Sequence, residues 1–214
     1  MENFEKETIA AIATALSDSG IGIVRISGEN AIYIVDSIFR STSGKKILTK
    51  VQSHTIHYGY IVDKDENIID EVMTSVMKAP KSYTMEDTVE INCHGGVLVM
   101  QKVLETVLQA GARLAEPGEF TKRAFLNGRI DLSRAEAVID VIHSQNEYAL
   151  SSSVSQLKGR LSDKIRSLRE DILYQIAFIE SALDDPEHIS LEGYPEQLSV
   201  KVKKFEKQIE KLLE

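Results

Sequence analysis

A chain of 214 residues, 43% hydrophobic and 27% charged, is long enough for one or two domains with a sizeable core. Its formal net charge of −8 argues against a self-sufficient nucleic-acid binder, so an RNA partner would need a local basic patch or another subunit. No apolar run approaches the length of a membrane span, and the first residues lack a signal-peptide pattern. The single cysteine, Cys93, excludes a disulfide framework, so we expect a cytoplasmic protein that does not enter membranes.

The first half of the sequence alternates between strand-like and helical patterns. An exposed loop rich in Ser, Thr and Lys is predicted over 40–51, and its Gly44-Lys45 pair lacks the other residues of a phosphate-binding loop. The apolar periodicity predicts strands over 8–14, 21–26, 54–62, 72–77 and 88–92, and helices over 29–39 and 97–110.

Two charged residues in these strands have apolar neighbours. Arg25 stands in the strand-like run IGIVRI, so it either faces water or points into a polar pocket. Glu90 alternates with apolar residues in TVEIN, so it points away from the core near the end of its strand. Both residues are therefore candidates for contact with a ligand.

The stretch 116–142 separates this strand-rich half from a helical half. It contains a Pro-Gly helix start, a turn at Asn127-Gly128 followed by Arg129, and a second helix start at Ser133 with capping-box spacing. Lys122 and Arg123 are interpreted as a solvated helix face. We predict a domain boundary within this stretch, which gives domains over 1–118 and 119–214.

The helical half carries an apolar stripe with an 11-residue repeat, which predicts a nearly straight helix that needs partner helices along its length. Gly159 lies inside the stripe and costs about 1 kcal/mol relative to alanine, which a packed helix can absorb. A second helix is predicted from Pro195 to the end, where the pattern stops without a capping signal, as expected for a piece of a longer protein. The repeat is marked by Leu150, Leu161, Ile172 and Leu183. The expected fold class is an α+β N-terminal domain with a mixed sheet, followed by an all-α domain.

Several segments resemble, in order, the N-terminal part of the tRNA-modification GTPases of the MnmE (TrmE) family. The longest and most specific is EPGEFTKRAFLNGRIDLSRAEAVIDVI at 116–142. The resemblance covers essentially the whole chain, although 143–214 match more by helical pattern than by motif. The other matching segments are TIAAIAT at 8–14, GIGIVRISG at 20–28 and EDTVEINCHGG at 86–96.

The resemblance implies a protein of three parts. The N-terminal α+β domain, similar to folate-binding aminomethyltransferase domains, would bind 5-formyl-tetrahydrofolate or a related folate and form a homodimer. A helical domain would follow, interrupted by a GTPase domain that uses GTP, potassium and magnesium. With a flavin-dependent partner protein, the family adds a carboxymethylaminomethyl-type group to C5 of the wobble uridine (U34) of certain tRNAs, using a formyl- or methylene-tetrahydrofolate one-carbon unit.

The sequence departs from the family pattern by omission. It holds no G-x-x-x-x-G-K-[ST] motif and no C-terminal cysteine motif, and Cys93 does not take the place of the latter. We therefore expect this segment to have no GTPase activity alone, and we assign no catalytic or metal-binding residue to it.

The resemblance places folate contacts at Arg25, Glu90 and Arg129. A pterin edge presents adjacent N–H donors, which the Glu90 carboxylate would accept as a pair. Carbonyls and the anionic glutamate tail call for guanidinium donors, which suits Arg25 and Arg129. The family often has lysine at the position of Arg129, which keeps the charge but changes the donor geometry. Without the resemblance, the three residues would be an exposed strand pair and a surface charge.

Two alternatives to this function stay open at the level of the sequence. One is a stand-alone folate-dependent protein of the aminomethyltransferase type. The other is a non-catalytic scaffold for dimerisation, in which the stretch 116–142 is only structural. The apolar stripe and the mid-pattern end of the chain favour the GTPase fragment over the stand-alone enzyme.

Overall fold

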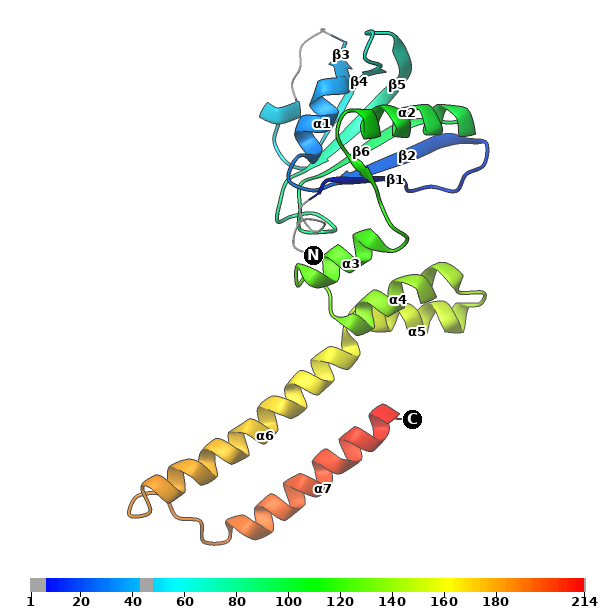
Figure 1. Ribbon diagram of the computed structural model, residues 1–214. Helices are drawn as coiled ribbons and strands as arrows, with labels where there is room; N and C mark the ends of the chain where they lie inside the picture. Colours follow the sequence, from blue (N-terminus) through cyan, green and yellow to red (C-terminus); the bar gives the residue numbers. More distant parts are fainter. Residues whose placement is uncertain (1–6, 43–47, 214) are drawn as a thin grey trace. The chain divides into compact units, whose positions relative to one another are not determined.

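The computed structural model describes residues 7–42 and 48–213 (Figure 1). Contacts divide the chain into two compact units, Met1–Ile130 and Asp131–Glu214. A boundary after residue 118 would assign the helix α3 (Glu119–Leu126) to the second unit, whereas the contacts group it with the first. The first unit combines a sheet with helices and the second is helical, which confirms the predicted fold class.

The first unit is built on one seven-stranded sheet in the order β3-β4-β5-β6-β2-β1-β7. Its pairs are antiparallel except β1 with β7, so the sheet is mixed, as predicted. The sequence pattern does not predict β3 and β7, which are only three and two residues long. The strands are β1 (Ile9–Ile12), β2 (Ser19–Ser27), β3 (Phe39–Ser41), β4 (Thr55–Val62), β5 (Ile68–Met77), β6 (Thr88–Gly95) and β7 (Arg113–Leu114).

The helices α1 (Ala31–Ile38) and α2 (Val97–Gln109) lie on one face of this sheet (Figure 1). Alternate residues of the central strands point towards these helices and are buried, as the period of two in the sequence requires. Val24 of β2 and Ile91 of β6 are fully buried in this layer, and Met100 of α2 packs against it. The core of the first unit therefore lies between the helices and the sheet.

The loop predicted over 40–51 is wrong in part. Its first residues belong to β3, and Leu48 begins the short 3₁₀ helix η2 (Leu48–Lys50). Leu48 is fully buried, and its backbone N–H donates to Asp36 Oδ1 at 2.8 Å. The polar composition of the segment 40–51 gave no indication that Leu48 is buried. Gly44 and Lys45 lie outside the described residues.

The opposite face of the sheet is open over β4 and β5 among the described residues. Ile56, Tyr58 and Met73 expose 68%, 54% and 45% of their surface on it. Directly opposed residues of neighbouring strands share a face, so the strand register shows which other side chains lie there. One row across this face consists of Ile56, Ser75, Glu90 and Arg25.

The second unit consists of helices. In the part of the chain that the structure describes, no helix combines the length and apolarity needed to cross a bilayer. The predicted C-terminal helix from Pro195 is confirmed as α7. The helices of this unit are α4 (Leu132–His143), α5 (Glu147–Leu157), α6 (Arg160–Asp184) and α7 (Tyr194–Leu213).

The predicted continuous helix through the apolar stripe is wrong, because the chain breaks between α5 and α6. Gly159 has a φ of 82°, a left-handed conformation that a right-handed helix cannot continue through. The Arg134 guanidinium fills the space that a Cβ at Gly159 would occupy. Helix propensity alone gives Gly159 a small penalty, whereas its positive φ favours glycine and the contact with Arg134 of another helix adds to this preference.

The start of α4 is tied to the start of α6. Asp131, and not Ser133, is the N-cap residue of α4, and its Oδ1 accepts the Arg134 backbone N–H at 2.9 Å. The other carboxylate oxygen, Oδ2, accepts the Ser162 hydroxyl at 2.6 Å. This hydrogen bond from Ser162 is the largest cause that lowers the pKa of Asp131. The capping-box spacing in the sequence therefore marked the right region but the wrong cap.

The helices α6 and α7 meet at a polar and aromatic contact. The ring centroids of Phe178 and Tyr194 lie 4.7 Å apart, and the Tyr194 hydroxyl donates to Gln175 Oε1 at 3.1 Å. Much of the apolar stripe is nevertheless exposed, and Leu183 shows 68% of its surface. The expectation that partner helices lie along this stripe stays a prediction.

We expect Gly159→Ala to destabilise the second unit more than Gly193→Ala. Both glycines have positive φ angles, and alanine in that region costs about 1 to 2 kcal/mol. At Gly193 a Cβ would meet open space, whereas at Gly159 it would displace Arg134 and the contact of Arg134 Nη2 with the Lys158 carbonyl at 3.4 Å. Urea unfolding of both variants measures the difference. Equal losses would show that the Arg134 contact does not hold the break.

Candidate ligand-binding site

Arg25 and Glu90 form an ion pair across neighbouring strands. They are directly opposed in the pairing of β2 with β6. Arg25 Nε donates to Glu90 Oε1 at 2.8 Å, and Nη2 lies 2.7 Å from the same oxygen. Both side chains are partly exposed on the open face of the sheet. The sequence left open whether Arg25 faces water or points into a polar pocket. In the structure it is partly exposed and is paired with a carboxylate, so its position combines the two.

Arg129 follows α3 at the predicted Asn127-Gly128 turn, where Gly128 has a φ of 77°. Its backbone N–H donates to the Ala124 carbonyl at 2.9 Å, which closes the end of the helix. Its Nη1 donates to the Tyr83 carbonyl at 3.3 Å. Arg129 is exposed, so its charge faces solvent next to the loop that carries Tyr83.

Tyr83 brings the predicted residues together. The Arg129 guanidinium carbon lies 4.8 Å from the centre of the Tyr83 ring, and that of Arg25 lies 5.8 Å from it. Arg25 also lies 5.7 Å from the centre of the Phe120 ring. Sequence reasoning missed both aromatic residues. The signal for Tyr83 was a large aromatic in an otherwise polar loop just before the strand of Glu90.

The site combines one carboxylate, two guanidinium groups and two aromatic rings within a small part of the first unit. A carboxylate accepts from N–H donors, guanidinium groups donate to carbonyl and carboxylate oxygens, and aromatic rings stack on planar groups. Such a set suits a planar ligand that has hydrogen-bond donors at one end and negative charge at another.

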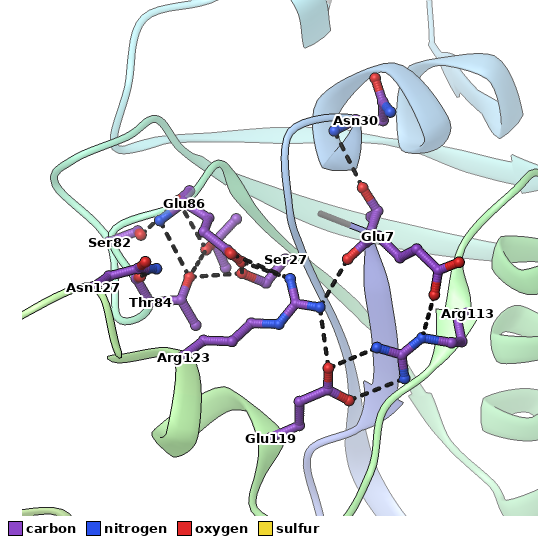
Figure 2. A network of polar contacts seen from close by, with 12 residues as sticks. Glu7, Ser27, Asn30, Ser82, Thr84, Glu86, Arg113, Glu119, Arg123 and Asn127 are labelled. Atoms are coloured by element: carbon purple, nitrogen blue, oxygen red, sulfur yellow. Dashed lines mark hydrogen bonds and ion pairs between the residues drawn. The ribbon is translucent and has the colours of Figure 1, made fainter. Parts of the chain in front are cut away.

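Beside this site lies a buried charge network around Arg123 (Figure 2). Arg123 exposes only 5% of its surface, so its interpretation as part of a solvated helix face is wrong; of the pair, Lys122 is the exposed residue. Nη1 of Arg123 lies 3.2 and 3.1 Å from the two carboxylate oxygens of Glu86. Nη2 donates to Glu119 Oε1 at 3.0 Å and to the Glu7 carbonyl at 2.8 Å.

Glu119 is the most strongly held carboxylate of this network. Burial acts to raise its pKa, but hydrogen bonds from Arg113, the Glu116 backbone and Arg123 outweigh burial and lower the pKa to about 2. Arg113 binds it through two nitrogens, at 2.7 and 3.1 Å. Glu119 is therefore ionised throughout the physiological range and balances the buried guanidinium of Arg123.

The network also fixes the loop before β6 (Figure 2). Glu86 Oε2 accepts the Ser27 hydroxyl at 2.7 Å, and the hydroxyls of Ser27 and Thr84 are 2.6 Å apart. Asn127 Nδ2 donates to the Thr84 carbonyl at 2.6 Å. Tyr83, next to Thr84, is therefore attached to buried contacts on its C-terminal side.

Cys93 takes no part in the site. It is buried in β6, and its thiol donates to the Gly22 carbonyl at 3.4 Å. Burial raises the pKa of the thiol to about 11, so it is protonated near neutral pH and unsuited to nucleophilic chemistry. Cys93 is thus a small buried residue of the core.

Comparison with known protein families divides the chain close to where its contacts divide it. Residues 8–129 match the family described as the N-terminus of the GTP-binding protein TrmE, and residues 132–214 match the MnmE helical domain. The two units are thus the N-terminal and helical domains of a GTP-binding protein family. The chain belongs to the MnmE family of tRNA modification GTPases.

Individual relatives agree with this assignment. Three proteins named tRNA modification GTPase MnmE come from Lachnoclostridium phytofermentans, Geobacillus kaustophilus and Bacillus subtilis. They are 64%, 54% and 51% identical over 192, 211 and 209 residues, which are 90%, 98% and 97% of this chain. The aligned regions are 42%, 46% and 45% of the relatives, so the chain spans less than half of their length.

The lowered pKa of Glu119 predicts a loss of stability in acid. The carboxylate stabilises the fold fully above its ordinary pKa of 4.5, and this contribution is lost as the pH falls towards 2. We expect the loss to reach about 3 kcal/mol of unfolding free energy. Denaturant unfolding of the chain between these pH values measures it.

Glu119→Gln is expected to remove this part of the acid dependence, because the amide does not titrate. Glu105→Gln is the matched control, since Glu105 pairs with Lys102 on the exposed side of α2. An unchanged pH profile in Glu119→Gln would mean that the network does not depend on the charge of Glu119.

Proposed function

We propose that this chain is the folate-binding and dimerising part of a tRNA-modifying GTPase. With a flavin-dependent partner protein, the whole enzyme would add a carboxymethylaminomethyl-type group to C5 of U34 in certain tRNAs. The observation that carries the proposal is the convergence of Arg25, Glu90 and Arg129 around Tyr83 in a chain of the MnmE family. The family assignment supports tRNA modification and GTP hydrolysis by the whole enzyme. The residues of the site support folate as the ligand of this chain.

The residues of the site fit a folate. Glu90 makes its contacts with Arg25 through Oε1, so within the described chain Oε2 is available to the donors of a pterin edge. The Arg129 guanidinium is exposed and offers Nε and Nη2 to a carboxylate. Arg25 would orient the Glu90 side chain and stabilise the negative charge of the Glu90 carboxylate. When bound, 5-formyl-tetrahydrofolate or a related folate would supply the one-carbon unit.

We place GTP hydrolysis, with its potassium and magnesium ions, in the part of the relatives that this chain does not span. The relatives are named GTPases, and this chain aligns with 42–46% of their length. The printed sequence contains no phosphate-binding loop motif. A protein that acts on tRNA with these cofactors would work in the cytoplasm.

We propose that the first unit forms a homodimer through the open face of the sheet. Ile56, Tyr58 and Met73 lie together on β4 and β5 and are largely exposed. An apolar patch of this kind on a folded unit marks a protein contact. If the folate site were absent, this patch would favour the alternative function, a non-catalytic dimerisation scaffold.

Calorimetric titration of the chain with 5-formyl-tetrahydrofolate tests the folate proposal. We expect Glu90→Ala to weaken binding at least tenfold, since a hydrogen bond to a charged group contributes about 1.5 to 3 kcal/mol. Glu105→Ala, which removes a carboxylate from the exposed side of α2, should bind like the unaltered chain. Absence of binding heat, or equal affinity of Glu90→Ala, would exclude the assigned site.

Sedimentation of the chain tests the dimer. Tyr58→Asp places a charge within the apolar patch, so we expect it to shift the chain from dimer to monomer. Tyr33→Asp is the control, because Tyr33 is also largely exposed but lies on α1, which covers the other face of the sheet. A dimer that persists in Tyr58→Asp would place the interface elsewhere.

A further inference from the structure

Tyr83 is the residue on which both guanidinium groups of the candidate site rest. Cation–π contacts use the face of the aromatic ring and leave the edges of a guanidinium free for hydrogen bonds. Within the part of the chain that the structure describes, Nη1 of Arg25 and both Nε and Nη2 of Arg129 have no hydrogen-bond partner. The ring therefore holds the two cations without using the donors that a ligand needs.

The position of the Tyr83 ring is itself fixed from several sides. Its hydroxyl lies 3.0 Å from Thr121 Oγ1 on α3. The next residue, Thr84, is buried and is held by the Ser27 hydroxyl and by Asn127 Nδ2. A ring held by its tip and by its backbone offers a rigid support, and rigid supports raise affinity because less order is lost on binding.

Arg129 depends on this support more than Arg25 does. Arg25 is also held by the Glu90 carboxylate and lies beside the Phe120 ring. Arg129 is exposed, and its described side-chain contacts are the ring and the carbonyl of Tyr83. Removal of the ring would thus leave Arg129 with one backbone carbonyl as its described side-chain partner, while Arg25 keeps the Glu90 carboxylate and the Phe120 ring.

We propose that Tyr83 is a positioning residue for ligand binding. It holds the Arg129 guanidinium so that the free donors Nε and Nη2 bind the carboxylate tail of a folate. The inference rests on the proposed folate-binding function and adds to it the residue that sets the strength of the tail contact. Tyr83 acts through Arg129, so its effect on affinity should vanish when Arg129 is absent.

A double-mutant cycle tests this dependence by calorimetry with 5-formyl-tetrahydrofolate. Tyr83→Leu should weaken binding about fivefold, the upper end of the scale for an exposed cation–π contact. In the background of Arg129→Ala, the same substitution should change affinity less than twofold. An equal loss in both backgrounds, or no loss in the unaltered background, would overturn the role of Tyr83.

Conservative variants separate the ring from its hydroxyl. Tyr83→Phe keeps the ring and should bind within about twofold of the unaltered chain, as should Thr121→Val, which removes only the partner of the hydroxyl. If Tyr83→Phe weakens binding as much as Tyr83→Leu, then the hydroxyl carries the effect and the inference is wrong.

A measurement on the unaltered chain covers the case in which Tyr83→Leu does not fold. The Nε–Hε NMR signal of Arg129 should be displaced by the ring current of Tyr83 and should move when 5-formyl-tetrahydrofolate is added. Binding heat with a stationary Arg129 signal would overturn the inference and leave folate binding intact. Absence of binding heat would overturn the proposed function, and the inference with it.

Discussion

The buried guanidinium of Arg123 is the constraint on which the first unit depends. A buried charge is unfavourable unless ionised partners surround it, and Arg123 has two, Glu86 and Glu119, together with the Glu7 carbonyl. These partners come from the segment before β1, the loop before β6 and the helix α3. A single side chain thus ties together three segments that are far apart in the sequence, and the loop with Tyr83 is one of them.

The same constraint explains how structure and function are divided along 116–142. Arg123 and Glu119 face inwards from α3 and stabilise the fold, whereas Arg129, just after the helix, faces outwards. The inward charges are paired with each other within the unit, while the outward charge of Arg129 keeps free donors within the described chain. A motif that is highly specific in sequence therefore serves two purposes, because it contributes both to the buried network and, through Phe120 and Arg129, to the candidate site.

The sequence predicted what depends on local pattern. Period-two alternation located most strands, and the family resemblance selected Arg25, Glu90 and Arg129, which the fold brings around one ring. It did not predict the burial of Arg123, because two of its partners, at residues 7 and 86, are distant in the chain and only Glu119 lies within the same helix. The break at Gly159 was missed for a related reason, since the residue that packs against this glycine is Arg134 of another helix.

The two outermost strands of the sheet have a consequence for how copies of the chain can meet. Strands at a sheet edge present unpaired backbone groups that invite another chain to extend the sheet. Here β3 and β7 are three and two residues long, so the outermost strands themselves offer only short ladders. Association by addition to the outermost strands is therefore disfavoured, which favours contacts between sheets that form through side chains. A contact of that kind can be dissolved by one charge, whereas a shared backbone ladder could not.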